Sequence, residues 1–354
     1  MSLNTKRFIG EIIKEGFTHL CVVPCSFAKN LINEAINNPK IEYLPAASEG
    51  VACSIAAGLK ISGKKPIVIV QSSGLTNMAS CITSLLNPYD ITFPILTSWR
   101  TYSEGDSEIQ HKHLATYLPN LIEAYGYNFE TLDKNNLNKA IETINKADTN
   151  KTICIIEKGS YDSVSLDLEH VLDVSSYFPR SAFLKILEKK FHDSENIFIG
   201  TTGNLSREMY SLMPNTKNFY MAGNMGGALS LGLGVAKAGK KVIVCGGDAE
   251  FVMHMGGLTS TGRYANEINL TYILFDNEQN KSTGGQNTYQ EHLDYIKIAE
   301  SSGLKCHQDI IYKIEVFGEL INSPSGLNFF HVKCGLDDEY PRPPLTNIKI
   351  NKIN

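Results

Sequence analysis

The 354-residue sequence lacks several features that would place it in a broad class at once. Its eight cysteines never form a Cys-x-x-Cys pair and mostly lie in apolar segments, which argues against a zinc site or a disulfide framework. No apolar run is long enough to span a membrane, and the N-terminal segment carries charges that a signal peptide would lack. Lys and Arg are scattered, so nucleic acid is not an expected partner. A net charge of −4 with 42% hydrophobic residues predicts a globular cytoplasmic protein.

What the sequence does contain is an internal repeat. Residues 49–65 align with residues 225–241 and are identical at Gly50/Gly226, Ala52/Ala228, Ser54/Ser230, Gly58/Gly234, Gly63/Gly239, Lys64/Lys240 and Lys65/Lys241. Each copy is followed by a short apolar strand and then by a glycine-containing turn. Short apolar strands that alternate with helical patterns indicate parallel sheets covered on both faces. We therefore predict two doubly wound α/β domains, 1–165 and 180–354, joined by a polar segment at 161–178.

An isolated acid, Asp248, follows the second of these strands directly after Gly246 and Gly247. An acid buried there without a partner would be costly, although an ordinary turn or a helix N-cap would also place an aspartate at this point. Asn277 ends the next predicted strand. In parallel sheets, ligands bind beyond the carboxyl ends of the strands, and Mg²⁺ prefers oxygen ligands of these types. Asp248 and Asn277 are therefore candidates to hold Mg²⁺ against a diphosphate.

These residues carry a resemblance to a known family. A Gly-Asp pair followed by a spacer and Asn resembles the signature of thiamine-diphosphate enzymes. Further sequence motifs resemble, in the same order, those of the phosphonopyruvate and sulfopyruvate decarboxylases over nearly the whole chain. These motifs are YLPAASEGVACSIAAG, QSSGLTN, TSWR, EIQHKHL, TTGNLSRE, GNMGGALSLGLG, DNEQNKSTGGQ and YPRP. The resemblance implies two domains of the thiamine-diphosphate-binding fold without a middle domain. The pyrimidine-binding domain would be 1–165, and the diphosphate- and Mg²⁺-binding domain would be 180–354.

The resemblance also implies roles for individual residues. Mg²⁺ would be bound by the side chains of Asp248 and Asn277 and by the backbone carbonyl of Gln279. Glu49 would contact the pyrimidine ring and activate the cofactor, because a carboxyl group at the ring nitrogen favours the tautomer that removes the thiazolium proton. The other expected cofactor-binding residues are Gly74, Thr202, Gly203, Asn224, Met225, Gly226, Gly247, Ala249 and Glu250.

Some of these residues have ordinary structural interpretations as well. Glu49 would suit the first turn of any helix, and Thr202 with Gly203 would suit a plain turn. The glycines around Asn224 precede a helix of small residues whose N-terminal amides would face a diphosphate. A dinucleotide-binding enzyme is the competing interpretation, but no Gly-x-Gly-x-x-Gly follows a strand in this segment.

Substrate recognition requires cations, because a 2-oxo acid with a second anionic group carries two negative charges. Arg suits phosphonate or sulfonate oxygens through its planar fork of donors. The candidates for substrate binding from the resembling segments are Ser26, Arg100, His111 and Lys281, with His113 as a weaker one, and Arg100 and His111 are also candidates for catalysis. Alternatively, Arg100 would pair with Asp106 or Glu108, Lys281 would be exposed, and His111 with His113 would suggest a metal pair that lacks further ligands.

The chain departs from the family pattern at several positions. Ala249 replaces the usual second Gly of Gly-Asp-Gly, a small change that should preserve metal binding. Thr76 replaces a usual glycine, and Gly227 stands where a histidine or another larger residue is common. The segment Glu278 to Lys281 replaces a usual Gly followed by apolar, aromatic and acidic residues, and this change bears on the choice of substrate.

The expected activity is Mg²⁺- and thiamine-diphosphate-dependent decarboxylation of 3-phosphonopyruvate to phosphonoacetaldehyde and CO₂. Sulfopyruvate decarboxylation is the nearest alternative. A carboligase or transferase would use the same cofactor residues but pass the activated unit to a second aldehyde or oxo acid, and a non-catalytic cofactor-binding protein is the remaining possibility. The resemblance implies at least a homodimer with active sites at subunit interfaces, a small 2-oxo acid as substrate, and neither nucleic acid nor membrane as a partner.

Overall fold

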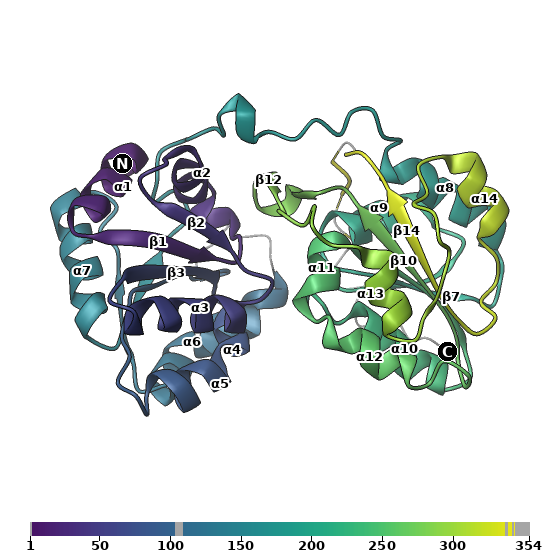
Figure 1. Ribbon diagram of the computed structural model, residues 1–354, viewed down its shortest axis with the longest axis horizontal. Coiled ribbons are helices and arrows are strands. Elements are labelled where there is room, and N and C mark those ends of the chain that lie inside the picture. Colours follow the sequence, from purple (N-terminus) through teal and green to yellow (C-terminus); the bar gives the residue numbers. More distant parts are fainter. Residues whose placement is uncertain (1, 103–108, 337–338, 342, 344–354) are drawn as a thin grey trace. The chain divides into compact units, whose positions relative to one another are not determined.

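The computed structural model describes residues 2–102, 109–336, 339–341 and 343. The chain divides into two compact units (Figure 1). The first unit comprises Met1–Val171 with Thr283–Asn287, and the second comprises Leu172–Ser282 with Thr288–Asn354. Each unit is built around its own six-stranded sheet.

The sheet of the first unit is parallel throughout. Its strands lie in the order β2 (Glu42–Pro45), β1 (Phe17–Val22), β3 (Lys65–Gln71), β4 (Ile95–Ser98), β6 (Thr152–Ile156) and β5 (Asn128–Thr131). The connecting helices are α1 (Thr5–Lys14), α2 (Lys29–Asn37), α3 (Glu49–Ile61), α4 (Gly74–Asn77), α5 (Ala79–Cys81), α6 (Lys112–Ala124) and α7 (Leu137–Thr149). Shorter turns of helix are η1 (Ser26–Ala28), η2 (Ile82–Leu86), η3 (Ile109–His111) and η4 (Leu168–His170).

Strand β3 shows why this segment forms a central strand. Ile67 and Ile69 belong to a core on one face of the sheet with α1, α2 and α7, whereas Val68 and Val70 belong to a core on the other face with α3 and α6. Successive side chains of a strand point to opposite faces, so a strand covered on both faces must be apolar at every position. The uninterrupted run 67–70 therefore indicates a strand covered on both faces.

The second unit also has a parallel sheet. Its strands lie in the order β13 (Lys305–Cys306), β14 (Leu327–Lys333), β10 (Asn269–Asp276), β9 (Lys241–Gly247), β7 (Ile197–Gly200) and β8 (Lys217–Tyr220). Its helices are α8 (Arg180–Phe191), α9 (Asn204–Leu212), α10 (Ala228–Lys237), α11 (Asp248–Met253), α12 (Gly256–Gly262), α13 (Tyr295–Ser301) and α14 (Ile314–Leu320). Two short strands, β11 (Gln279–Asn280) and β12 (Gln286–Asn287), form a separate sheet, and η5 (Lys281–Thr283) lies between them.

The two large sheets have the same strand order. In chain order, the six strands of the second sheet are β7, β8, β9, β10, β13 and β14, and they occupy the same places in that sheet as β1 to β6 do in the first. The helices of the sequence repeat, α3 and α10, each precede the third strand of their unit. The predicted fold class, two doubly wound parallel α/β sheets, is confirmed, and the sequence repeat coincides with equivalent elements.

The segment between the units begins along the first unit. Asn33 Nδ2 donates a hydrogen bond to the carbonyl of Val164 (2.8 Å), and Asn37 Nδ2 donates to the carbonyl of Ser165 (2.8 Å). All eight cysteines are free, and six of them are buried. Within the described part of the chain, no helix combines the length and the apolar character needed to cross a membrane.

Candidate cofactor site and active site

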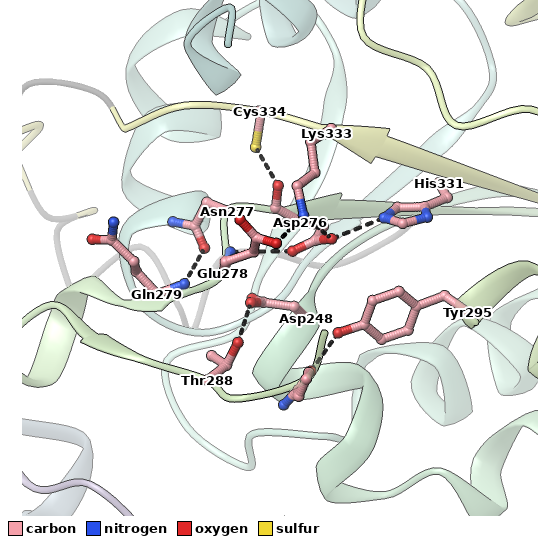
Figure 2. Close-up of polar contacts among 11 residues, drawn as sticks. Asp248, Asp276, Asn277, Glu278, Gln279, Thr288, Tyr295, His331, Lys333 and Cys334 are labelled. Carbon is pink, nitrogen blue, oxygen red and sulfur yellow. Dashed lines mark hydrogen bonds and ion pairs between the residues drawn. The ribbon is translucent and has the colours of Figure 1, made fainter. Parts of the chain in front are cut away.

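Asp248 lies at the carboxyl end of β9, as the first residue of α11. Its side chain is buried, and Thr288 Oγ1 donates a hydrogen bond to its Oδ2 (3.1 Å; Figure 2). Burial and the nearby Asp276 carboxylate raise the pKa of Asp248 to about 7. Among the described residues no Lys, Arg or His forms an ion pair with Asp248. The protein thus buries an acid at a strand end without supplying a cation to neutralise it.

The neighbouring acid, Asp276, has the opposite environment. His331 Nε2 lies 2.9 Å from its Oδ2, and Lys333 Nζ lies 2.9 Å from the same oxygen. Although burial alone would raise it, the contacts with His331 and Lys333 hold the pKa of Asp276 below its usual range. Lys333 Nζ also lies 2.6 Å from Glu278 Oε1. His331 and Lys333 are therefore already paired with carboxylates other than Asp248 (Figure 2).

Asn277 follows β10 directly, and its side chain is also buried. Strands β9 and β10 pair in register with Phe275 opposite Gly247, so Asp248 and Asn277 emerge from adjacent strand ends. The backbone N–H of Gln279 approaches Asn277 Oδ1 at 3.4 Å, and Gln279 Nε2 donates to the carbonyl of Leu172 (3.0 Å). Figure 2 shows Asp248, Asn277 and Gln279 at the same edge of the sheet.

This arrangement fits a bound Mg²⁺. A carboxylate without a protein counter-ion, a buried amide oxygen and a backbone carbonyl are the hard oxygen ligands that Mg²⁺ takes, usually together with waters and phosphate oxygens. The described residues contain no group of three or more His, Cys, Asp or Glu side chains that could hold a metal. The predicted metal ligands therefore comprise one carboxylate and two neutral oxygens. The assignment of Asp248, Asn277 and Gln279 as ligands stays a prediction.

The unusual pKa of Asp248 has a consequence for stability. An acid whose pKa is raised by folding favours the folded state below its ordinary pKa and loses that contribution as the pH rises through the folded value of about 7. Without metal and cofactor, we expect Asp248→Asn to raise the free energy of unfolding by about 2 kcal/mol near pH 8 and by much less at about pH 4. Urea unfolding of both proteins at the two pH values measures this, and an equal effect at both would contradict it.

Two turns of the second unit contain residues that are predicted to bind the diphosphate. Gly203, with φ +84°, is the N-cap of α9, and a Cβ placed on it would lie 3.9 Å from Ser282. In the turn before α10, Asn224 has φ +60° and Gly226 has φ +88°. A side chain at Gly226 would come within 2.9 Å of His254, so this turn requires glycine for both conformation and space. Thr202 and Met225 are partly exposed beside these turns.

Ala249 and Glu250 follow Asp248 in α11. Glu250 is buried and accepts hydrogen bonds from the Tyr272 hydroxyl (2.9 Å) and from the N–H of Ala228 (3.2 Å). Burial raises the pKa of Glu250 to about 7. Glu250 therefore connects the start of α10 to β10, and its predicted role in cofactor binding is untested.

Glu49 begins α3 in the first unit, and its side chain is buried. Asn77 Nδ2 donates a hydrogen bond to Glu49 Oε2 (2.8 Å), which fixes the carboxylate from the neighbouring helix α4. Gly74 lies so close that a Cβ added to it would be 2.5 Å from Glu49 Cγ. The prediction that Gly74 belongs to the site thus has a specific physical reason, since only glycine leaves room for the glutamate side chain.

Gly74→Ala is therefore expected to displace Glu49 without removing it. Small displacements of catalytic groups are costly, so we expect kcat to fall roughly 10- to 100-fold. Gly10→Ala is the matched control, because nothing lies within 4 Å of a Cβ at Gly10 in α1. Steady-state kinetics of both variants measure the effect, and equal kcat values for the two variants would show that Gly74 does not position Glu49.

The structure brings together three of the predicted substrate residues in the first unit. Arg100 is buried at 7% exposure, and its Nη1 donates to Ser26 Oγ (3.0 Å) and to Gln71 Oε1 (3.3 Å). The guanidinium carbon lies 4.6 Å from the centre of the Phe27 ring. Gln71 Nε2 in turn lies 3.0 Å from His111 Nε2. Ser26, Gln71 and Arg100 come from the carboxyl ends of β1, β3 and β4, which are adjacent in the sheet.

His113 and Lys281 are the two remaining candidates. His113 is exposed on α6, where its ring packs against Tyr117 at 4.9 Å between ring centres. Lys281 belongs to η5 in the second unit and is partly exposed. Asp106 and Glu108, which are the alternative partners predicted for Arg100, lie outside the described residues.

Sequence reasoning missed several residues of these clusters. Gln71 and Asn77 stand in the QSSGLTN word that was used for the resemblance, but nothing in a single sequence marks which polar side chains turn inward. His331 and Lys333 gave a clearer signal, because two basic residues two positions apart in an apolar strand must share one face. The register of β10 with β14 then places Lys333 opposite Asp276.

Comparison with known proteins agrees with this architecture. Residues 4–116 match the family model "Thiamine pyrophosphate enzyme, N-terminal TPP binding domain", and residues 199–321 match the corresponding C-terminal TPP binding domain. The chain is therefore a thiamine-diphosphate-dependent enzyme with both binding domains.

Relatives that align over most of the chain define the family further. Phosphonopyruvate decarboxylase of Streptomyces viridochromogenes is 30% identical over 82% of this chain and 77% of its own length, and that of Streptomyces hygroscopicus is 29% identical over the same shares. Sulfopyruvate decarboxylase of Methanosarcina acetivorans is 27% identical over 93% of this chain and 91% of its own length. The chain belongs to the phosphonopyruvate and sulfopyruvate decarboxylase family and is a 2-oxo acid decarboxylase. Mg²⁺ is the usual partner metal of such enzymes.

Proposed function

We propose that the protein decarboxylates 3-phosphonopyruvate to phosphonoacetaldehyde and CO₂. Two relatives that align over most of the chain are named phosphonopyruvate decarboxylases. The observation that carries the proposal is the buried Arg100, whose guanidinium lies beside Ser26, Gln71 and Phe27 at the carboxyl edge of the first sheet. A guanidinium held in this way suits a substrate that carries a phosphonate in addition to its carboxylate.

The second unit would hold the diphosphate end of the cofactor. Asp248, Asn277 and the carbonyl of Gln279 would bind Mg²⁺, and the metal would neutralise the buried Asp248 carboxylate. The turns at Gly203 and at Gly226 would direct backbone amides at phosphate oxygens, as the starts of α9 and α10 allow. Thiamine diphosphate, when bound, supplies a carbon nucleophile that also accepts the electrons released with CO₂.

The first unit would provide the acid and the substrate site. Glu49 would bond to the pyrimidine ring and hold or release a proton there, and Asn77 keeps its carboxylate in place. Arg100 and Ser26 would orient the phosphonate of the substrate. We propose His111 as the group that handles protons on the substrate side, because it is connected to Arg100 through Gln71.

We further propose that the protein acts as at least a homodimer with active sites at subunit interfaces. The acid Glu49 and the metal ligands belong to different units of the chain, so one cofactor must be held by two units. Helix α3, which begins with Glu49, exposes the apolar side chains of Val51 (44%), Ile55 (36%) and Ile61 (73%). Covering such side chains is a common consequence of self-association.

Sulfopyruvate is the second candidate substrate, because the Methanosarcina acetivorans relative that covers 93% of this chain is named a sulfopyruvate decarboxylase. Sulfonate and phosphonate are both tetrahedral oxyanions, and Arg100 would bind either. They differ in charge, since only the phosphonate carries a second ionisable oxygen.

A comparison of substrates tests the proposal. CO₂ release by the purified protein with Mg²⁺ and thiamine diphosphate would be measured for 3-phosphonopyruvate, sulfopyruvate and pyruvate, with product analysis for each. We expect kcat/KM to be at least about tenfold higher for phosphonopyruvate than for sulfopyruvate, and phosphonoacetaldehyde to be the product. A preference for sulfopyruvate would overturn the substrate assignment, and condensation products in place of free aldehyde would identify a carboligase.

A further inference from the structure

The side chain of Gln71 connects Arg100 to His111 within the first unit. Gln71 is the last residue of β3, and its register partner on β4 is Ser98, two residues before Arg100. The amide of Gln71 lies within hydrogen-bonding distance of three polar side chains. Its Oε1 lies 3.3 Å from Arg100 Nη1, and its Nε2 lies 2.9 Å from Ser73 Oγ and 3.0 Å from His111 Nε2.

Arg100 decides which way this amide points. A guanidinium only donates hydrogen bonds, so the atom of Gln71 that faces Arg100 must be the carbonyl oxygen. The opposite orientation would place the amide NH₂ against the guanidinium and leave two donors facing each other. The NH₂ group of Gln71 therefore faces Ser73 and His111, and its two N–H bonds match these two neighbours.

The fixed amide determines the state of the imidazole. The Nε2 of His111 faces an NH₂ group, which has no lone pair to accept a hydrogen bond, so His111 Nε2 must be the acceptor. A neutral imidazole with an unprotonated Nε2 carries its proton on Nδ1. An imidazolium would present an N–H at Nε2 and lose this hydrogen bond.

We propose that Gln71 is a positioning residue that holds His111 as the neutral Nδ1–H tautomer, with Arg100 fixing the amide of Gln71. In the context of the proposed function, on which this consequence rests, Arg100 is the cation that receives the second anionic group of the substrate. His111 then contributes a neutral ring whose proton is carried by Nδ1. The positive charge of the substrate site is thereby carried by Arg100, and the transferable proton is carried by His111. Gln71 keeps His111 neutral beside the charged Arg100.

The tautomer can be observed directly by nitrogen NMR of protein labelled with ¹⁵N-histidine, at neutral pH and without substrate. His111 is one of nine histidines, and the signals that vanish in His111→Gln assign it. We expect Nδ1 to resonate as a protonated ring nitrogen and Nε2 as an unprotonated one. In Gln71→Leu this preference should be lost, and the two nitrogens should move toward averaged values. In Gln71→Glu the carboxylate would accept from the ring, so Nε2 should become protonated.

Gln308→Leu is the matched control, since it removes the side-chain amide of an exposed glutamine in the second unit. A protonated Nε2 in the unmodified protein would overturn the proposal, and so would an unchanged His111 spectrum in both Gln71 variants. Thermal unfolding of each variant confirms that it is folded, and the two substitutions provide independent chances of obtaining folded protein. Because no substrate is used, this result is independent of the substrate comparison, and failure of one does not imply failure of the other.

Discussion

Replacing Glu49 by Gln is expected to lower the rate of CO₂ release by at least about 100-fold while changing the affinity for thiamine diphosphate only a few-fold. The reason is that an amide of the same shape keeps the packing against Gly74 but cannot exchange a proton with the cofactor ring. Loss of a proton-transferring group of this kind typically costs 100- to 10,000-fold in rate, roughly. Activity assays at saturating cofactor, combined with calorimetric titration of the cofactor, separate the two effects.

Glu42→Gln is the matched control for this experiment. Glu42 lies on β2 with an exposed side chain that contacts His19, and its substitution should leave both activity and cofactor binding unchanged. A more specific measurement is the exchange of the thiazolium C2 proton of bound cofactor with deuterium, which should slow in Glu49→Gln and remain fast in Glu42→Gln. Activity and proton exchange near the unmodified rate in Glu49→Gln would show that the acid has been assigned to the wrong residue.

The second large effect is expected for Asp248→Ala. The structure buries Asp248 beside Asp276, whose own charge is already compensated by His331 and Lys333. A bound metal ion would stabilise the ionised carboxylate of Asp248, whose pKa without metal is raised to about 7. We expect the Mg²⁺-dependent affinity for thiamine diphosphate to fall at least about 100-fold, equivalent to about 2.7 kcal/mol, with activity lost in parallel. Calorimetric titrations of the cofactor with and without Mg²⁺ give both values directly.

Asp309→Ala removes an exposed acid from the same unit and is the control for the change in net charge. It should bind cofactor as the unmodified protein does. Because Asp248→Ala also removes a costly buried charge, the metal-free variant should unfold at a higher denaturant concentration at neutral pH. Lower stability together with unchanged cofactor affinity would indicate that Asp248 serves only the fold.

The fold could be predicted from the sequence because its signals are local. Apolar runs such as 67–70 and 242–244, each preceded by a helix of small residues, mark strands covered on both faces, and the repeat shows that the pattern occurs twice. The order of the strands within each sheet is harder to predict from the sequence, since it depends on which crossover connections pack best. The structure shows that the repeat extends to this level, with equivalent strand orders in the two sheets.

The placement of two predicted site residues could be foreseen because backbone position alone decides it. Asp248 and Asn277 follow neighbouring strands, so their proximity follows from the order of β9 and β10. The supporting contacts could not be foreseen in the same way. Gln71 and Asn77 act through side-chain orientation, which depends on loops packed around them. The dependence of Glu49 on Gly74 arises from a close approach in space, in which a Cβ at Gly74 would lie 2.5 Å from Glu49 Cγ.

Glu278 shows how a departure from the family pattern is accommodated. It stands where the family usually has glycine, and its φ of +56° lies in the left-handed region that glycine adopts without strain. The ion pair between Glu278 and Lys333 compensates, because a buried lysine holds the carboxylate in this conformation. The sequence shows the substitution but gives no indication of the distant lysine that makes it tolerable.

The most direct test of the metal assignment is a crystal structure of the protein with Mg²⁺ and thiamine diphosphate bound. We expect the metal within about 2.1 Å of an oxygen of Asp248, of the side-chain oxygen of Asn277 and of the backbone carbonyl of Gln279, with diphosphate oxygens completing its coordination. A metal bound elsewhere, or a diphosphate held with Asp248 outside the coordination sphere, would contradict the assignment.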